Sequence, residues 1–156
     1  RKLCFDRKRH FKFEMVRMPI SDIYGLRQAF DNIKNDPYML ERHAKIGNAV
    51  RAAVKEAGLE LYQETGFSNT VTVFNVPEGT TDTAILTAMK EKCNIMLAGS
   101  FGAFAGKVIR IGHMGENAYP EKVGAVMAGL DLVFKDLGIT LKCSLKEAYD
   151  RKMSEQ

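Results

Sequence analysis

The stretch GSFGAFAGKVIRIGHMG, residues 99–115, contains five of the thirteen glycines in the chain. With Gly106-Lys107 inside it, the stretch invites comparison with a loop that binds phosphate. A Walker-type loop needs a glycine where Phe101 stands and a hydroxyl where Val108 stands. A strand is expected after Lys107, so no helix N-terminus would face a phosphate, and the dinucleotide fingerprint fails for the same reason. The stretch is therefore not a phosphate loop.

The segment KVIRIG, residues 107–112, places an arginine in an otherwise apolar strand. Side chains alternate between the two faces of a strand, so Arg110 shares one face with Val108 and Gly112, opposite Ile109 and Ile111. A partly buried guanidinium needs an anion, and its planar fork matches a carboxylate. Two partners stay open: an acidic side chain in a structural salt bridge, or the carboxylate of a ligand. The preceding glycines favour turns or a close approach of the backbone.

Composition limits the class of protein. The chain has 156 residues, of which 46% are hydrophobic and 27% charged, as in one globular domain. No bilayer-length apolar run or signal-peptide pattern is present. Cys4, Cys93 and Cys143 are few and irregularly spaced, which argues against a disulfide framework or zinc site and fits a cytoplasmic protein. We expect no metal and no membrane partner.

The net charge of +4 is concentrated in a basic N-terminal segment, RKLCFDRKRHFKF, with interleaved aromatic residues. Such a segment could bind nucleic acid by phosphate contact and stacking. Without it the chain is almost neutral, so we favour a solvated or partner-covered segment and expect no nucleic-acid partner.

Hydrophobic periodicity and turn residues predict five helices and four strands. The helices are expected at about 21–34, with Ser21 or Asp22 as cap, and at 36–57, 83–92, 120–137 and 145–153. The strands are expected at 59–62, 70–76, 95–99 and 107–113. Short connections and few strands predict an α+β fold, with a small, mostly antiparallel sheet and helices packed on one face. No Ser-His-Asp or Cys-His arrangement is evident, and His10, His43 and His113 have no partner of defined spacing.

The segment GKVIRIGHMG, with AGSFGAFA before it, resembles the C-terminal signature of the class V, fold-type-I pyridoxal-phosphate aminotransferases. The similarity is greatest to the alanine–glyoxylate and serine–pyruvate group. It covers about Pro19 to Ile139 and includes ISDIYGLRQAF, SNTVTVFNVPEG and LDLVFKDLGI in the same order. On this resemblance, residues 1–18 are a basic segment left from a preceding large domain, and 19–156 are the C-terminal small domain.

The resemblance implies a homodimeric enzyme that uses pyridoxal phosphate to move an amino group between a small amino acid, like alanine or serine, and a 2-oxo acid, like glyoxylate or pyruvate. It implies that Arg110 binds the substrate carboxylate and that Gly99, Ser100 and Gly102 form a loop near the active site. Arg17 stands close to a threonine position of the family and would bind the cofactor phosphate of the neighbouring subunit.

The resemblance also implies that the Schiff-base lysine lies upstream of the matched region. We therefore expect no catalytic residue in this chain, no activity of the chain alone, and a large cofactor-binding domain of the same protein as its partner. The alternative is a stand-alone α+β module that binds a small molecule without catalysis.

Overall fold

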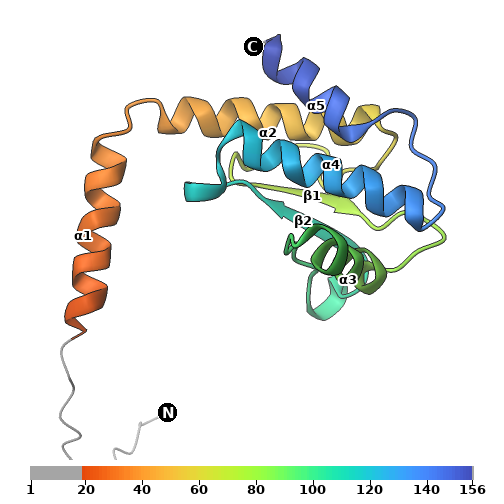
Figure 1. Ribbon diagram of the computed structural model, residues 1–156, viewed down its shortest axis with the longest axis horizontal. Helices are drawn as coiled ribbons and strands as arrows, with labels where there is room; N and C mark the ends of the chain where they lie inside the picture. The colour runs from red at the N-terminus through yellow and green to blue at the C-terminus, as the bar shows by residue number, and fades with distance from the viewer. Residues whose placement is uncertain (1–18, 156) are drawn as a thin grey trace, which may run out of the picture. The chain divides into compact units, whose positions relative to one another are not determined.

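The computed structural model describes residues 19–155, and the chain divides into two compact units, residues 1–37 and 38–156 (Figure 1). The described part of the first unit is helix α1, Ile20–Lys34. Pro19 occupies its N-cap position and no side chain caps it, so the expectation of a cap at Ser21 or Asp22 is wrong. A proline at the start of a helix already has the φ angle that the helix requires.

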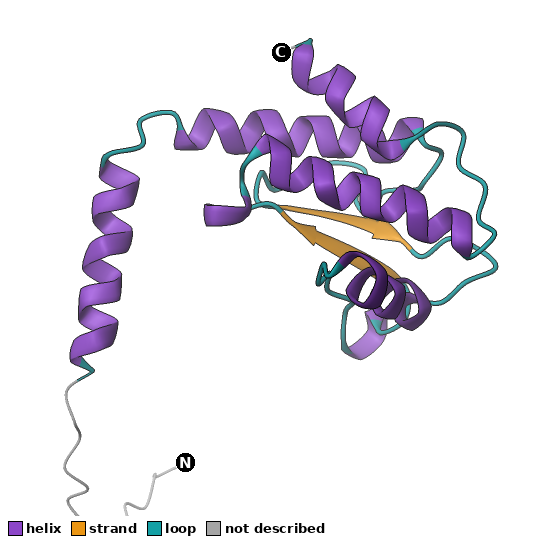
Figure 2. Cartoon of the chain, in the orientation of Figure 1, coloured by secondary structure: helices purple, strands orange, loops and turns teal. Residues whose placement is uncertain are grey.

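The second unit contains helices and two strands in an α+β order (Figure 2). Its helices are α2 (Met39–Glu56), α3 (Asp82–Cys93), α4 (Pro120–Asp136) and α5 (Leu145–Ser154), and its strands are β1 (Val71–Asn75) and β2 (Val108–Gly112). Two 3-10 turns, η1 (Gly102–Phe104) and η2 (Gly115–Asn117), flank β2. Among the described residues, no helix combines the length and the apolar character needed to cross a membrane.

Local sequence signals set the helix boundaries. The Thr81 hydroxyl accepts a hydrogen bond from the Ala84 backbone N–H at the start of α3, and Ser144 does the same for Glu147 in α5. Each cap satisfies a backbone donor that has no partner within the helix. Pro120 is the first residue of α4, where its missing N–H is not needed.

The sheet consists of β1 and β2, paired antiparallel with Val73 opposite Arg110. The predicted strands at 59–62 and 95–99 are wrong as strands, since each forms only a single bridge: Leu61 with Phe74, and Ala98 with Arg110. Both segments follow a residue in the left-handed conformation, Gly58 (φ 85°) or Asn94 (φ 54°). The first exchanges backbone hydrogen bonds with β1 only from Tyr62 N–H to the Val73 carbonyl and from Asn75 N–H to the Glu60 carbonyl, and the second with β2 only between Ala98 and Arg110.

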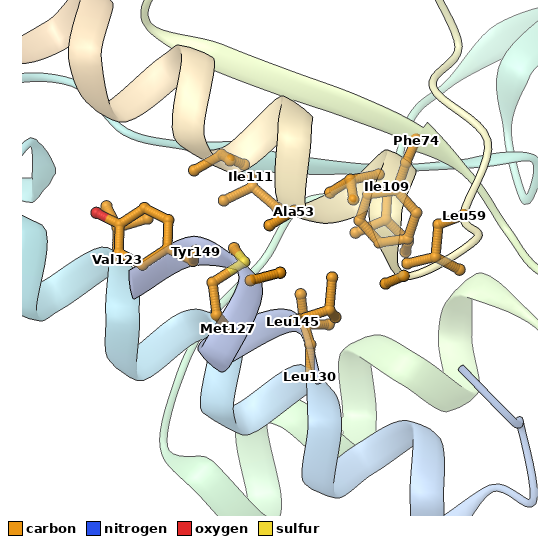
Figure 3. Packing of buried hydrophobic residues seen from close by; sticks show 14 of the residues in the cluster. Ala53, Leu59, Phe74, Ile109, Ile111, Val123, Met127, Leu130, Leu145 and Tyr149 are labelled. Atoms are coloured by element: carbon orange, nitrogen blue, oxygen red, sulfur yellow. The ribbon is translucent and has the colours of Figure 1, made fainter. Parts of the chain in front are cut away.

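The hydrophobic core lies between one face of the sheet and the helices (Figure 3). Phe74 of β1 and Ile109 and Ile111 of β2 are fully or almost fully buried there. Phe74 also meets Phe134 of α4 edge to face, with ring centroids 6.5 Å apart. Residues of α2, α4 and α5 complete the cluster, among them Ala53, Met127, Leu130, Leu145 and Tyr149. The predicted α+β fold, a small antiparallel sheet with helices on one face, is confirmed.

Candidate functional site

Arg110 lies in the middle of β2, on the sheet face opposite the hydrophobic core. Its neighbours Ile109 and Ile111 are buried in the core, whereas Arg110 is half-buried. The five-residue register with β1 sets this arrangement, because every second side chain of β2 must face away from the helices. The guanidinium therefore projects from a hydrogen-bonded strand of the sheet, opposite Val73 of β1.

The loop before β2 holds the Arg110 side chain in one orientation. Arg110 Nε donates to the Gly99 carbonyl at 2.7 Å, and its backbone N–H donates to the Ala98 carbonyl at 2.7 Å. Gly99 itself packs closely on α3: a Cβ there would lie 3.2 Å from Asp82 Oδ2 and 3.4 Å from Leu86 Cδ1. Glycine at position 99 lets the loop approach α3 closely, and its carbonyl reaches Arg110.

No acidic side chain of the described residues pairs with Arg110. Among residues 19–155, the Arg110 side chain makes one hydrogen bond, from Nε to the Gly99 carbonyl. Nη1 and Nη2 have no protein acceptor among these residues. The ion pairs lie elsewhere, for example between Lys92 and Asp136 at 2.6 Å. Of the two partners that the sequence leaves open, a structural salt bridge therefore has no candidate among residues 19–155.

A cavity of about 720 Å³ opens beside Arg110. Segment 95–98, β2, η2 and the first half of α4 line it, mostly with apolar side chains such as Leu97, Met114 and Val126. Its charged lining residues are Arg110 and Lys122, and none of the lining residues is acidic. A cavity with two cations and no acid favours an anionic ligand.

Lys122 and Asn117 are lining residues that the sequence reasoning missed. Lys122 Nζ donates to the Glu116 carbonyl and lies 5.4 Å from the centre of the Tyr119 ring. Their position soon after GHMG could have indicated this role, because the first turn of a helix that starts shortly after a strand can lie near the end of that strand.

The other site residues predicted from the sequence do not line the cavity or lie outside the described residues. Gly99 contacts Arg110, whereas Ser100 and Gly102 do not line the cavity. Gly102 has φ 62° and begins η1, so its glycine serves the backbone turn. Arg17 lies outside the described residues. No group of three or more His, Cys, Asp or Glu side chains in residues 19–155 could hold a metal ion.

His113 is fully buried on the core side and does not line the cavity. Burial lowers the pKa of its imidazole to about 4, and the positive charges of Arg51 and His43 act in the same direction. The imidazole is therefore neutral at pH 7, and both of its nitrogens are hydrogen-bonded within the protein.

The chain is similar in sequence to several aminotransferases. It is 36% identical over 120 residues to the serine–glyoxylate aminotransferase of Arabidopsis thaliana, which covers 74% of this chain and 30% of that protein. It is 34% identical over 133 residues to the (S)-ureidoglycine–glyoxylate transaminase of Bacillus subtilis, covering 82% and 32%. No protein-family model matches the chain.

The fold is similar to solved structures of the same kind. The pyridoxamine–pyruvate aminotransferase of Mesorhizobium loti has a TM-score of 0.82 at 28% identity, over 89% of this chain and 37% of that one. The ureidoglycine–glyoxylate aminotransferase of Bacillus subtilis gives 0.80 at 28% identity, over 86% and 35%. The resemblance inferred from the sequence is confirmed, and the chain spans about a third of the length of these relatives.

Proposed function

We propose that this chain, a homologue of part of the class V aminotransferases, is the carboxylate-binding small domain of a pyridoxal-phosphate-dependent aminotransferase. The observation that carries the proposal is the cavity at Arg110, where a fixed guanidinium has two nitrogens without a protein acceptor among the described residues and the lining has no acidic side chain. The whole enzyme would transfer an amino group between a small amino acid, like serine or alanine, and a 2-oxo acid, like glyoxylate or pyruvate.

Arg110 would bind and orient the substrate. Its Nη1 and Nη2 can donate two parallel hydrogen bonds to one carboxylate, while the bond from Nε to the Gly99 carbonyl keeps the guanidinium plane in place. Lys122 adds positive charge to the same cavity. The apolar lining beside Arg110 would lower the local dielectric constant and so strengthen the interaction with the anion. The carboxylate would thereby fix the α-carbon that reacts.

The cofactor would be held mainly by residues outside this chain. The cavity has no Ser or Thr hydroxyl to bind a phosphate, and its one lysine, Lys122, is exposed and bonded to the Glu116 carbonyl. These residues fit the carboxylate of a substrate and do not fit pyridoxal phosphate. We therefore assign to this domain substrate binding, with no covalent step.

The apolar surface of α1 supports a partner in the whole protein. Four of its apolar residues recur at helical spacing and are 51–63% exposed: Ile23, Leu26, Phe30 and Ile33. An exposed apolar stripe of this kind marks a contact surface. We propose that the large cofactor-binding domain of the same protein covers it, and that the complete enzyme is a cytoplasmic homodimer. Light scattering of the complete enzyme should give the molecular mass of a dimer. The mass of a monomer would contradict the proposal.

The test is transamination by the complete protein that carries this chain, with serine or alanine as donor and glyoxylate or pyruvate as acceptor. Loss of a charge-assisted bidentate contact costs about 2–5 kcal/mol, so Arg110→Ala should lower kcat/KM roughly 30-fold or more for every substrate. Glu78→Ala, at an exposed residue that does not line the cavity, is the control and should leave kcat/KM unchanged. Wild-type kinetics of Arg110→Ala would contradict the proposal, as would transamination by the 156-residue chain alone.

A further inference from the structure

A buried imidazole joins the two strands just beyond Arg110. His113 follows the last residue of β2, and its backbone N–H donates to the Thr70 carbonyl at 2.9 Å, which extends the ladder by one residue. Its side chain, fully buried, lies 2.9 Å from Thr72 Oγ1 through Nε2 and 3.1 Å from the Asn69 carbonyl through Nδ1. Three hydrogen bonds thus connect the residue after β2 to residues 69–72, where β1 begins.

The partners define the protonation state of this imidazole. The Asn69 carbonyl can only accept, so Nδ1 carries the proton and donates to it. Nε2 then accepts from the Thr72 hydroxyl. Both ring nitrogens are satisfied by the neutral form.

Helix α2 holds the same loop from its other side. Arg51 Nη1 donates to the Ser68 carbonyl at 2.8 Å, and Nη2 donates to Asn48 Oδ1 at 2.6 Å. The helix can come this close because residue 47 is glycine: a Cβ there would lie 3.1 Å from Arg51 Nη1 and 3.3 Å from His113 Cε1. The loop before β1 is therefore clamped between α2 and the end of β2.

We propose that His113 is a positioning residue for Arg110, and that it acts by fixing the register of the short β1–β2 ladder. The ladder has five residue pairs, from Val71 with Gly112 to Asn75 with Val108. A slip of one residue in β2 would turn Arg110 toward the core face, because the side-chain period of a strand is two. The hydrogen bond between Thr72 and His113 exists in the observed register alone, so it opposes such a slip. This inference rests on the proposed role of Arg110 in carboxylate binding.

The test measures binding of propionate, a carboxylate that cannot react, to the complete protein by titration calorimetry or ligand-observed NMR. Thr72→Val keeps the shape of the side chain and removes the hydroxyl that His113 accepts from. Removing one partner of a buried hydrogen bond should raise the Kd for propionate about tenfold. Thr72→Ser keeps the hydroxyl and should bind as the wild type does. Ser68→Ala is the matched control, because the Ser68 side chain bonds Thr70 and not His113.

A double-mutant comparison separates positioning from a general loss of structure. In the Arg110→Ala background, Thr72→Val should cause no further rise in Kd, because its effect passes through Arg110. His113→Phe should likewise raise the Kd in the wild-type background and cause no further rise in the Arg110→Ala background. If His113→Phe does not fold, the comparison of Thr72→Val with Thr72→Ser still decides the question. Unchanged propionate binding by folded Thr72→Val, or an equal loss in both backgrounds, overturns the inference and leaves the proposed function intact. Wild-type binding by Arg110→Ala overturns both.

Discussion

The stability of the fold should depend on pH through His113, and the structure gives the sign and size of the effect. Burial lowers the pKa of this imidazole from 6.5 to about 4 in the folded chain. The unfolded chain therefore binds a proton over pH 4 to 6.5 that the folded chain does not. Stability contributed by the neutral imidazole is fully present above pH 6.5 and is lost as the pH falls toward 4.

Between pH 7 and pH 5 the loss from this one group is about 2 kcal/mol, because each pKa unit corresponds to about 1.36 kcal/mol. Urea unfolding of the chain at pH 7 and pH 5 measures it, with His113→Gln as the comparison. The variant has no imidazole at this position, so its stability should fall by about 2 kcal/mol less than that of the wild type over the same interval. All other residues are the same in the two proteins, so their contributions cancel in the difference.

Two results would refute this reasoning. One is an equal loss of stability in wild type and His113→Gln between pH 7 and pH 5. The other is an NMR titration in which the His113 ring of the folded chain protonates with a pKa near 6.5. Either would mean that the ring is not sealed between β1, β2 and α2 as described.

Other substitutions test the packing that supports the site. Asp131→Ala removes a carboxylate that accepts from one hydroxyl and two backbone N–H groups at the start of α5, and it should lower the free energy of unfolding by about 2–4 kcal/mol in urea titrations. Gly47→Ala crowds Arg51 and His113 and should destabilise by about 1–3 kcal/mol; a melting temperature equal to that of the wild type would contradict the close approach of α2. Gly99→Ala crowds Asp82 and displaces the carbonyl that holds Arg110, so carboxylate binding should weaken several-fold with α3 intact; unchanged affinity would mean that the Gly99 carbonyl does not set the guanidinium.

Much of the fold followed from local sequence patterns. The alternation of KVIRIG predicts which face carries Arg110, since Ile109 and Ile111 must reach the core. Thr81 and Pro120 predict the starts of two helices for reasons that hold within a few residues of chain. The segments 59–62 and 95–99 have the composition of strands, but ladder length depends on the partner strand and on the turns around it, which composition does not encode.

The sequence predicted the central residue of the candidate site, Arg110, but not the residues that surround it. Arg110 is conspicuous because a charge in an apolar strand needs an explanation. The cavity lining has no acidic side chain among residues 19–155, and Lys122 reaches it from α4; both features depend on tertiary packing. His113 lacked a partner of defined spacing, since Thr72 lies 41 residues away along the chain and meets it only in the folded register.

The most direct test of the central claim compares two ligands of nearly the same shape, propionate and the neutral propionamide, on the complete protein. If Arg110 binds a substrate carboxylate, the wild type should prefer propionate by roughly 30-fold or more, since a charge-assisted bidentate contact contributes about 2 kcal/mol or more. Arg110→Ala should bind the two ligands with almost equal affinity. A wild-type protein that does not distinguish them, or an Arg110→Ala variant that keeps the full preference, would contradict the account.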